Sequence, residues 1–404
     1  MTALLVSEIF PPQTGGSGRW FWEIYRRLPR DRVVVAAGEY HGAEEFDRAH
    51  EVRVHRLPLS LPSWGIVSLS GMKNYWRAVR ALTRIARCHS VEQIHCGRCL
   101  PEGLMARMIQ LKTGLPFICY AHGEELKYAA SSRELTWLAR RVLRRAAFVI
   151  ANSSSTRQIL ADGWRVPPDR IRLMHPGVDT RQFQPAPRDA AARSRLGWGG
   201  RPVILTVGRL QKRKGHDMMI RALPAIRRQV PDVLYAILGD GEERHALDQL
   251  AREQGQFDAV RFHGELSDAD LTAAYQQCDL FVLANRQVGQ DIEGFGMVLV
   301  EAQACGKPVV AGASGGTAET MRIPDTGCVV NCEGPDELAM TVSELLLDPA
   351  RRERMGQAAR TWVEDRFDWD SLSRAAMAMF AGIPRTMCSR NHSTVTASTA
   401  TARE

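Results

Sequence analysis

Residues 203–229 read VILTVGRLQKRKGHDMMIRALPAIRRQ. The apolar run at 203–207 predicts a buried strand, and the spacing of apolar residues at 216–229 predicts the helix that follows it. Between them lies a basic loop that Gly208 and Gly215 bracket. A strand, a short loop and a helix in this order are the unit from which parallel α/β sheets are built.

The same alternation extends along the chain in both directions. Strands are expected at 2–7, 32–37, 52–57, 92–96, 116–121 and 148–152, and after 203–207 at 233–238, 260–262, 280–284 and 308–311. A helical run is expected to begin at Trp20, and further helices are expected at 72–88, 103–112, 134–145 and 154–162, and after 216–229 at 243–254, 267–277, 297–305, 335–347 and 350–365. This order predicts an α/β fold of two Rossmann-like, doubly wound domains that face a central cleft.

Composition sets the expected domain boundaries. Residues 1–185 form the first domain and 201–365 the second, joined by a linker at 186–200 that is rich in Pro, Ala, Arg and Gly. A C-terminal helix at 366–386 is expected to pack back on the first domain. The Ser/Thr-rich tail at 387–404 has almost no large apolar residue, so we expect it to be disordered.

Composition also excludes several classes of protein. Of the 404 residues, 45% are hydrophobic and 24% charged, which excludes a coiled coil and a chain disordered throughout. No run of about 18 apolar residues and no signal peptide is recognised, so a cytoplasmic protein without a transmembrane helix is expected. The nine cysteines are too few for a disulfide scaffold. Cys96 and Cys99 form a C-x-x-C, but ordinary thiols are favoured there over a zinc or redox site.

The net charge of +8 is unevenly distributed. Residues 1–190 contain 28 Lys and Arg against 17 Asp and Glu, a balance of +11, so the remainder carries −3. The excess of positive charge in the first half therefore predicts an anionic binding partner, such as a lipid headgroup or a phosphorylated substrate. Nucleic acid is disfavoured because no recognition motif accompanies the charge.

Two expected helices in that half combine basic and aromatic residues. The basic positions are Lys73, Arg77, Arg80, Arg84 and Arg87 in the first, and Arg133, Arg140, Arg141, Arg144 and Arg145 in the second. Helices of this kind can lie on an anionic bilayer, and ordinary solvated charge explains them equally well. Peripheral attachment to the inner face of a membrane is therefore a hypothesis.

The strongest motif for function is EGFGMVLVE at 293–301, which places two glutamates eight positions apart. A helix starting at Met297 would leave the N–H groups of Gly296, Met297 and Val298 free to bind an anion. Glu293 would lie on the loop and Glu301 about one turn into the helix, where both could accept hydrogen bonds from sugar hydroxyls. The alternative is that each is a solvated surface charge.

The basic loop at 208–215 is the second motif. Arg209 and Lys214 stand next to the bracketing glycines and could together neutralise a diphosphate. For Lys212 and Arg213, in contrast, a solvated position is favoured.

Taken in order, these motifs resemble the retaining nucleotide-sugar glycosyltransferases of family 4, which have the GT-B fold. The resemblance covers about residues 1–380. It rests on GGSGR at 15–19, AHGEE at 121–125, HPGVD at 175–179, VGRLQKRKG at 207–215, LGDGEE at 238–243, the E-x7-E string and SGGTAE at 314–319.

The resemblance implies roles for individual residues. Arg209 and Lys214 would hold the donor diphosphate, Glu301 the ribose, Glu293 the transferred sugar, and the amides of Gly296, Met297 and Val298 sugar hydroxyls or phosphate. Gly15 and Gly16 would let the first loop approach the diphosphate, His122 would lie at the reacting face, and the backbone near Arg261 would touch the base. His122 could instead be a structural histidine, and Gly15–Gly16 a simple turn. His175 and Asp179 are assigned to the hinge, and Gly315 and Gly316 to shaping a loop.

The resemblance also implies the reaction. A hexose would pass from a nucleoside diphosphate sugar to a lipid, a lipid-linked glycan or another acceptor that the first domain binds. No cofactor or metal is expected. Retention is expected to proceed by same-face attack, since no residue is an obvious nucleophile. An epimerase, a glycan phosphorylase and a non-catalytic relative remain as alternatives; the donor, the base and the oligomeric state are left open.

Overall fold

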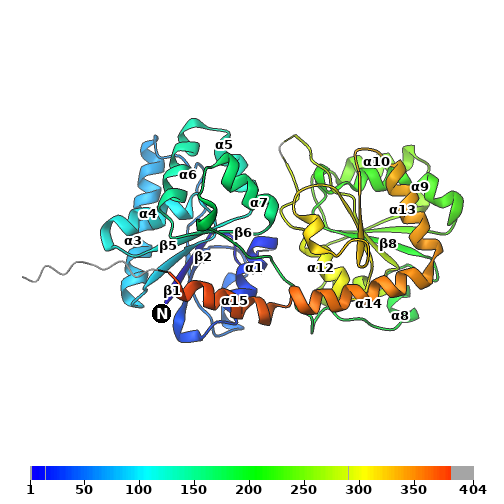
Figure 1. Cartoon of the computed structure of the whole chain (residues 1–404), viewed down its shortest axis with the longest axis horizontal. Coiled ribbons are helices and arrows are strands. Elements are labelled where there is room, and N and C mark those ends of the chain that lie inside the picture. Colours follow the sequence, from blue (N-terminus) through cyan, green and yellow to red (C-terminus); the bar gives the residue numbers. More distant parts are fainter. Residues whose placement is uncertain (1, 14, 290, 384–404) are drawn as a thin grey trace, which may run out of the picture.

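The computed structural model describes residues 2–13, 15–289 and 291–383. It contains two sheets whose paired strands are all parallel, each covered by helices (Figure 1). The first sheet has the order β3-β2-β1-β4-β5-β6-β7 and the second the order β10-β9-β8-β11-β12-β13. The predicted fold of two doubly wound α/β domains is therefore confirmed.

The strands are short and mostly buried along their whole length, because helices cover both faces of each sheet. In the first sheet they are β1 (Ala3–Ser7), β2 (Val33–Gly38), β3 (Arg53–Leu57), β4 (Gln93–Cys96), β5 (Phe117–Ala121), β6 (Val149–Ala151) and β7 (Ile171–Leu173). In the second they are β8 (Val203–Val207), β9 (Leu234–Leu238), β10 (Val260–Gly264), β11 (Leu280–Leu283), β12 (Val309–Gly312) and β13 (Gly327–Val330). The sequence analysis did not predict β7 and β13, two edge strands of which only part is buried.

The helices are mostly those expected. The first domain has α1 (Gly16–Tyr25), α2 (Ala43–Arg48), α3 (Leu69–Cys88), α4 (Glu102–Thr113), α5 (Glu124–Ala130), α6 (Arg133–Arg145) and α7 (Ser154–Gln158). After it come α8 (Ala190–Arg195), α9 (His216–Gln229), α10 (Arg244–Glu253), α11 (Asp268–Gln277), α12 (Met297–Ala304), α13 (Asp336–Leu347), α14 (Pro349–Arg366) and α15 (Trp369–Ala381). Those missed, α2, α5 and α8, span two turns or fewer, so no helical period develops in them.

The segment expected as a linker is largely folded onto the second domain. Within 186–200, α8 is capped by the carboxylate of Asp189, and Trp198 is buried in the core beneath the second sheet. The Arg193 guanidinium is also buried and donates to the carbonyl of Gly199 at 2.8 Å and to that of Gln277. The sequence analysis did not predict this fold for the segment, because a buried arginine that donates to carbonyl groups cannot be told from an exposed arginine in a sequence.

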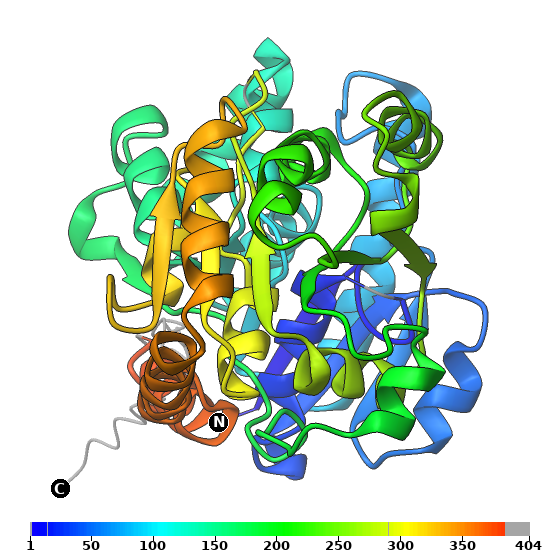
Figure 2. The ribbon, with the colours of Figure 1, turned by 90° about the vertical axis from the view of Figure 1, so that its right-hand side faces the viewer.

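The C-terminal helices connect the two domains. α14 runs along the second domain, and α15 lies against α1 of the first (Figures 1 and 2). Trp369 and Phe380 of α15 are buried together with Tyr25 and Trp20 in the first domain. The disorder expected for 387–404 falls outside the described residues.

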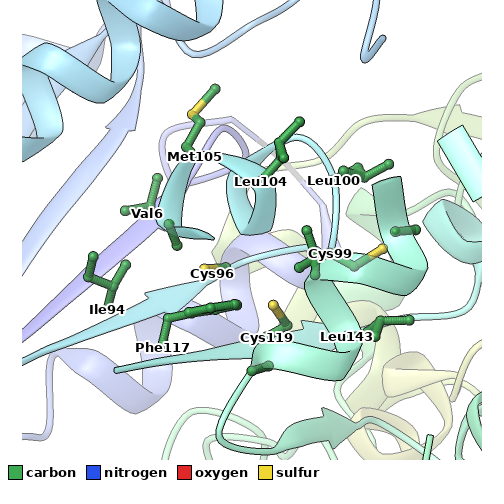
Figure 3. Packing of buried hydrophobic residues seen from close by; sticks show 14 of the residues in the cluster. Val6, Ile94, Cys96, Cys99, Leu100, Leu104, Met105, Phe117, Cys119 and Leu143 are labelled. Carbon is green, nitrogen blue, oxygen red and sulfur yellow. The ribbon is translucent and has the colours of Figure 1, made fainter. Parts of the chain in front are cut away.

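The thiols of the C-x-x-C lie in the core of the first domain. Cys96, Cys99 and Cys119 are free, buried and surrounded by Val6, Phe117 and Leu143 (Figure 3). Burial raises the pKa of the Cys99 and Cys119 thiols well above the ordinary range. Within the described part of the chain, no group of three or more His, Cys, Asp or Glu could hold a metal ion. These cysteines therefore pack as small apolar side chains.

Candidate active site between the two domains

The candidate residues come from loops at the carboxyl ends of the strands. In the second sheet the strand order reverses between β8 and β11, and the loops that follow these strands carry Lys214 and Glu293. In the first sheet it reverses between β1 and β4, and the loop after β1 leads to Gly15 and Gly16. Ligands bind at such points in open α/β sheets, because the adjacent loops diverge and leave a crevice.

Glu293 lies buried among cations. Its Oε2 accepts from Lys214 Nζ at 2.6 Å and from Arg213 Nη1 at 2.5 Å. Burial by itself would raise the pKa of the Glu293 carboxyl, but Lys214 and Arg213 outweigh it and hold that pKa below its ordinary value. The prediction of a carboxylate in the cleft is supported by this geometry, and the alternative of a solvated surface charge is wrong.

The solvated position favoured for Arg213 is also wrong. Its side chain is 9% exposed, and Nη2 lies 2.9 Å from Glu124 of the first domain. Lys212, by comparison, is 52% exposed and pairs with Asp217 at 3.1 Å within the second domain. The loop ends at Gly215, which has φ +72° and approaches the end of β11 so closely that a Cβ there would be 1.7 Å from the Ala284 carbonyl oxygen. A glycine is therefore required at this position.

Glu301 is buried one turn into α12, as predicted, and is already hydrogen-bonded. Its Oε1 accepts from Arg19 of the first domain at 2.8 Å, and its Oε2 accepts from the Tyr275 hydroxyl at 2.6 Å. Burial and the neighbouring Glu301 carboxylate raise the pKa of Tyr275 well above its ordinary value, which keeps this hydroxyl a donor. Sequence reasoning missed Arg19 and Tyr275, because neither stands near Glu301 in the chain.

The first domain meets the helix that carries Glu301 through its glycine loop. α1 begins at Gly16, and a Cβ added there would lie 3.6 Å from the sulfur of Met297, the first residue of α12. Gly296 precedes that helix with φ +90°, a conformation that favours glycine. Gly15, Gly16, Gly296, Met297 and Val298 are thus gathered where the N-termini of two helices face the cleft.

His122 stands on the first-domain wall of this cleft. Its Nε2 lies 2.9 Å from the Gly97 carbonyl oxygen, so it donates there, and Nδ1 can then accept from the Ser17 hydroxyl at 3.2 Å. Its backbone carbonyl faces the opposite domain, since a Cβ on Gly294 would lie 2.9 Å from it. His122 is therefore firmly hydrogen-bonded and also next to the Glu293 loop, so both of its interpretations are compatible with the structure.

Gly315 and Gly316 shape the loop that holds Glu293. Gly315 has φ +67°, and a Cβ there would lie 1.7 Å from the Glu293 carbonyl oxygen. The Gly316 N–H donates to the same oxygen at 3.1 Å. This agrees with the expectation that the two glycines act on the loop.

The remaining predicted residues lie further from the cluster. Arg209 is exposed at the start of its loop. Arg261 is exposed on the edge strand β10, with its guanidinium against Gly197, so its contact with a base stays a prediction. His175 bonds Glu319 at 2.9 Å and stacks on Phe295, which agrees with a role in the hinge.

Comparisons with known proteins identify relatives that cover nearly the whole chain. The family model described as "Glycosyltransferase Family 4" matches residues 14–182, and "Glycosyl transferases group 1" matches residues 189–362. A GDP-mannose-dependent alpha-(1-6)-phosphatidylinositol monomannoside mannosyltransferase of Mycolicibacterium smegmatis is 34% identical over 94% of this chain and 98% of its own. A GDP-mannose-dependent monoacylated alpha-(1-6)-phosphatidylinositol monomannoside mannosyltransferase of Corynebacterium glutamicum is 30% identical over 95% of this chain and 98% of its own.

Among solved structures, Anabaena Alr3699/HepE in complex with UDP superposes with a TM-score of 0.80. It is 22% identical and covers 94% of this chain and 100% of its own. At this identity the likeness concerns the fold alone.

Proposed function

Because the chain belongs to the family 4, group 1 glycosyltransferases, we propose that it transfers mannose from GDP-mannose to a phosphatidylinositol mannoside. Relatives that match nearly the whole chain carry this activity in their names. The observation that carries the proposal is the pairing of buried Glu293 with Lys214 across from His122, in a cleft that the two domains share. A cation at this position can stabilise the charge of a departing diphosphate, and the carboxylate can accept hydrogen bonds from sugar hydroxyls.

Different residues of the cleft have different roles in the proposed reaction. Breaking the bond at the anomeric carbon builds negative charge on the departing diphosphate, and fixed cations stabilise that charge more in the transition state than in the ground state. Lys214, with Arg209 at the start of the same loop, supplies them. Glu293 accepts hydrogen bonds from the mannosyl hydroxyls, and Glu301 accepts them from the ribose.

A panel of nucleotide sugars tests the donor. Purified enzyme is incubated with GDP-mannose, GDP-glucose, UDP-glucose and UDP-galactose, with phosphatidylinositol mannoside as acceptor, and the released nucleotide is measured. We expect turnover with GDP-mannose to exceed that with the uridine donors by at least about tenfold, the factor that about 1.4 kcal/mol provides. Turnover with a uridine donor alone would overturn the choice of donor and leave the family assignment intact.

Retention of configuration and independence from metal are part of the proposal. In this scheme Lys214 and Arg209 perform the charge stabilisation that a divalent cation performs in other enzymes. The anomeric configuration of the product, read by NMR, decides between retention and inversion. If the enzyme needs no metal, treatment with EDTA should leave turnover unchanged. A loss of activity that Mg²⁺ restores would refute metal independence.

We also propose that the first domain, which would bind the acceptor, lies on a membrane surface. The exposed faces of α3 and α6 carry all ten basic residues singled out in the sequence. Beside them stand Val67 and Leu69, which are 81% and 82% exposed. The Glu134 carboxylate of α6 accepts from the Val67 N–H at 3.0 Å, which holds this loop against the start of α6. Exposed apolar side chains framed by cations suit an anionic bilayer. No helix in the described residues is long and apolar enough to cross a bilayer.

Sedimentation with liposomes tests this surface. We expect the enzyme to pellet with phosphatidylglycerol vesicles at low salt, less at moderate salt, and little with phosphatidylcholine. Replacing Val67 and Leu69 together by Asp should abolish pelleting. The control replaces Met340 and Leu347 by Asp; these are also apolar and are 58% and 56% exposed on α13 of the second domain. Equal pelleting of both double variants would refute the assignment.

A further inference from the structure

Arg213 holds three carboxylates from two domains together. Besides Glu293 it contacts Glu124 at 2.9 Å and Asp291 at 3.2 Å. Glu124 begins α5 in the first domain, two residues after His122, whereas the other two carboxylates belong to the loop before α12. A single buried guanidinium therefore joins the wall that carries His122 to the carboxylate expected to contact the sugar.

This contact depends on how closely the domains approach. The Glu124 side chain is 64% exposed and reaches Arg213 across the domain boundary. Glu293, in contrast, is buried and belongs to the same domain as Arg213. Opening the cleft would break the pair with Glu124 while leaving the pair with Glu293 in place. Because a buried guanidinium is poorly stable without its full set of counter-charges, closure and the position of Arg213 are linked.

Arg213 also determines what Lys214 is free to do. Both cations bind the same oxygen of Glu293. If Lys214 turns toward a diphosphate, Arg213 keeps the Glu293 charge compensated and its carboxylate oriented. Without Arg213, Lys214 would be the sole cation on Oε2 and would be held away from the phosphate.

We propose that Arg213 is a positioning residue that couples the orientation of Glu293 to closure of the two domains through its bond with Glu124. The expected effect of Arg213 on turnover rests on the proposed function. Its expected effect on domain closure rests only on the contact between the two domains. In an active enzyme, the Glu293 carboxylate then takes its sugar-binding orientation only when the first domain, which carries His122, has closed onto the second.

A double-mutant cycle tests the coupling. We expect R213Q to lower kcat about 30-fold and E124Q about fivefold, with little further loss when the two are combined, because residues that act through one contact are not additive. In R213Q the acid limb of the pH profile of kcat should also move to higher pH, because Glu293 loses a neighbouring cation and the pKa of its carboxyl rises. A purely structural defect would lower activity without moving that limb. The matched control is K212M, a cation of the same loop that pairs within its own domain, and it should keep wild-type kcat.

A second measurement does not depend on activity. Spin labels on Leu111→Cys and Phe257→Cys, both exposed and in different domains, report the distance between the domains. Cys88, Cys328 and Cys388 are replaced by Ser so that the spin labels do not attach to them. We expect a longer, broader distribution in E124Q and R213Q than in the parent and K212M, with and without added GDP. Should R213Q fail to fold, R213K keeps the charge without the planar fork and takes its place.

The outcomes separate the two proposals. Multiplicative losses in the cycle, or an R213Q kcat within twofold of wild type, would overturn the coupling in an enzyme that turns over normally. If the wild type transfers no sugar from any donor, the proposed function fails, and the label distances still decide the coupling. Distances unchanged in both variants would overturn it in that case.

Discussion

Replacing Lys214 by Met removes the cation whose Nζ lies 2.6 Å from Glu293, and it keeps most of the apolar volume of the side chain. Glu293 remains paired with Arg213 at 2.5 Å, so no buried carboxylate is left alone and the fold should survive. The change therefore acts mainly on the charge that meets the departing diphosphate.

The magnitude follows from Coulomb's law. A cation about 4 Å from a phosphate oxygen, at an effective dielectric constant of about 20, contributes about 4 kcal/mol. Part of this is already present in the ground state, so about 3–4 kcal/mol is lost from the transition state, as when one group that stabilises a developing anion is removed. The expected fall in kcat is between about 100-fold and about 1,000-fold.

The assay measures initial rates of nucleotide release with saturating GDP-mannose and acceptor, alongside K212M as the matched control. Circular dichroism and thermal melting establish that both variants are folded. If Lys214→Met keeps kcat within tenfold of wild type, Lys214 does not stabilise the leaving group and the charge argument is refuted. An equal loss in K212M would show instead that the loop responds to any lost cation.

Three further predictions concern the carboxylates. Tyr275→Phe removes a hydrogen bond to a buried carboxylate, worth about 1.5–3 kcal/mol, so the KM for the donor should rise about tenfold or more with kcat nearly unchanged; a lower kcat at constant KM would contradict this. Because the folded-state pKa of Glu293 lies below its ordinary 4.5, the stability from its ion pairs is present above that pH and is lost as pH falls through the lower folded value. Melting curves between about pH 3 and 6 should therefore show Lys214→Met losing stability at a higher pH than K212M, and coincident curves would argue against the pairing. Gly315→Ala should weaken donor binding and lower the melting temperature, because φ is +67° and the Glu293 carbonyl oxygen occupies the space, whereas Gly334→Ala, with no atom within 4 Å, should change neither.

The fold could be predicted because its signals are local. Apolar runs such as 203–207 and 233–238 are buried on both faces in parallel sheets, so they differ plainly from the helices between them. Prediction was wrong where the signal was short or ambiguous. The edge strands β7 and β13 were not predicted because only part of each is buried. The segment at 186–200 was predicted to be a linker, although Trp198 and Arg193 are buried in it.

The candidate site residues were proposed from features that are also local. A glycine before a helix start, as at Gly296, and a basic loop between Gly208 and Gly215 are features of consecutive residues. Glu293, Glu301 and Lys214 were identified in this way, and all three line the domain boundary or its immediate surroundings. The solvated position expected for Arg213 was wrong, since its exposure depends on where the neighbouring domain lies.

The alternation of strands and helices, and the loops from which the candidate side chains emerge, follow from residues that are close together in the chain. Which charged groups meet depends on the folded arrangement of the two domains. Arg213 and Glu293 are 80 residues apart, Arg213 and Glu124 are 89 apart, and Arg19 and Glu301 are 282 apart. Ion pairs over such separations form when two folded domains bring their loops together and exclude water from them, and no local pattern records that approach.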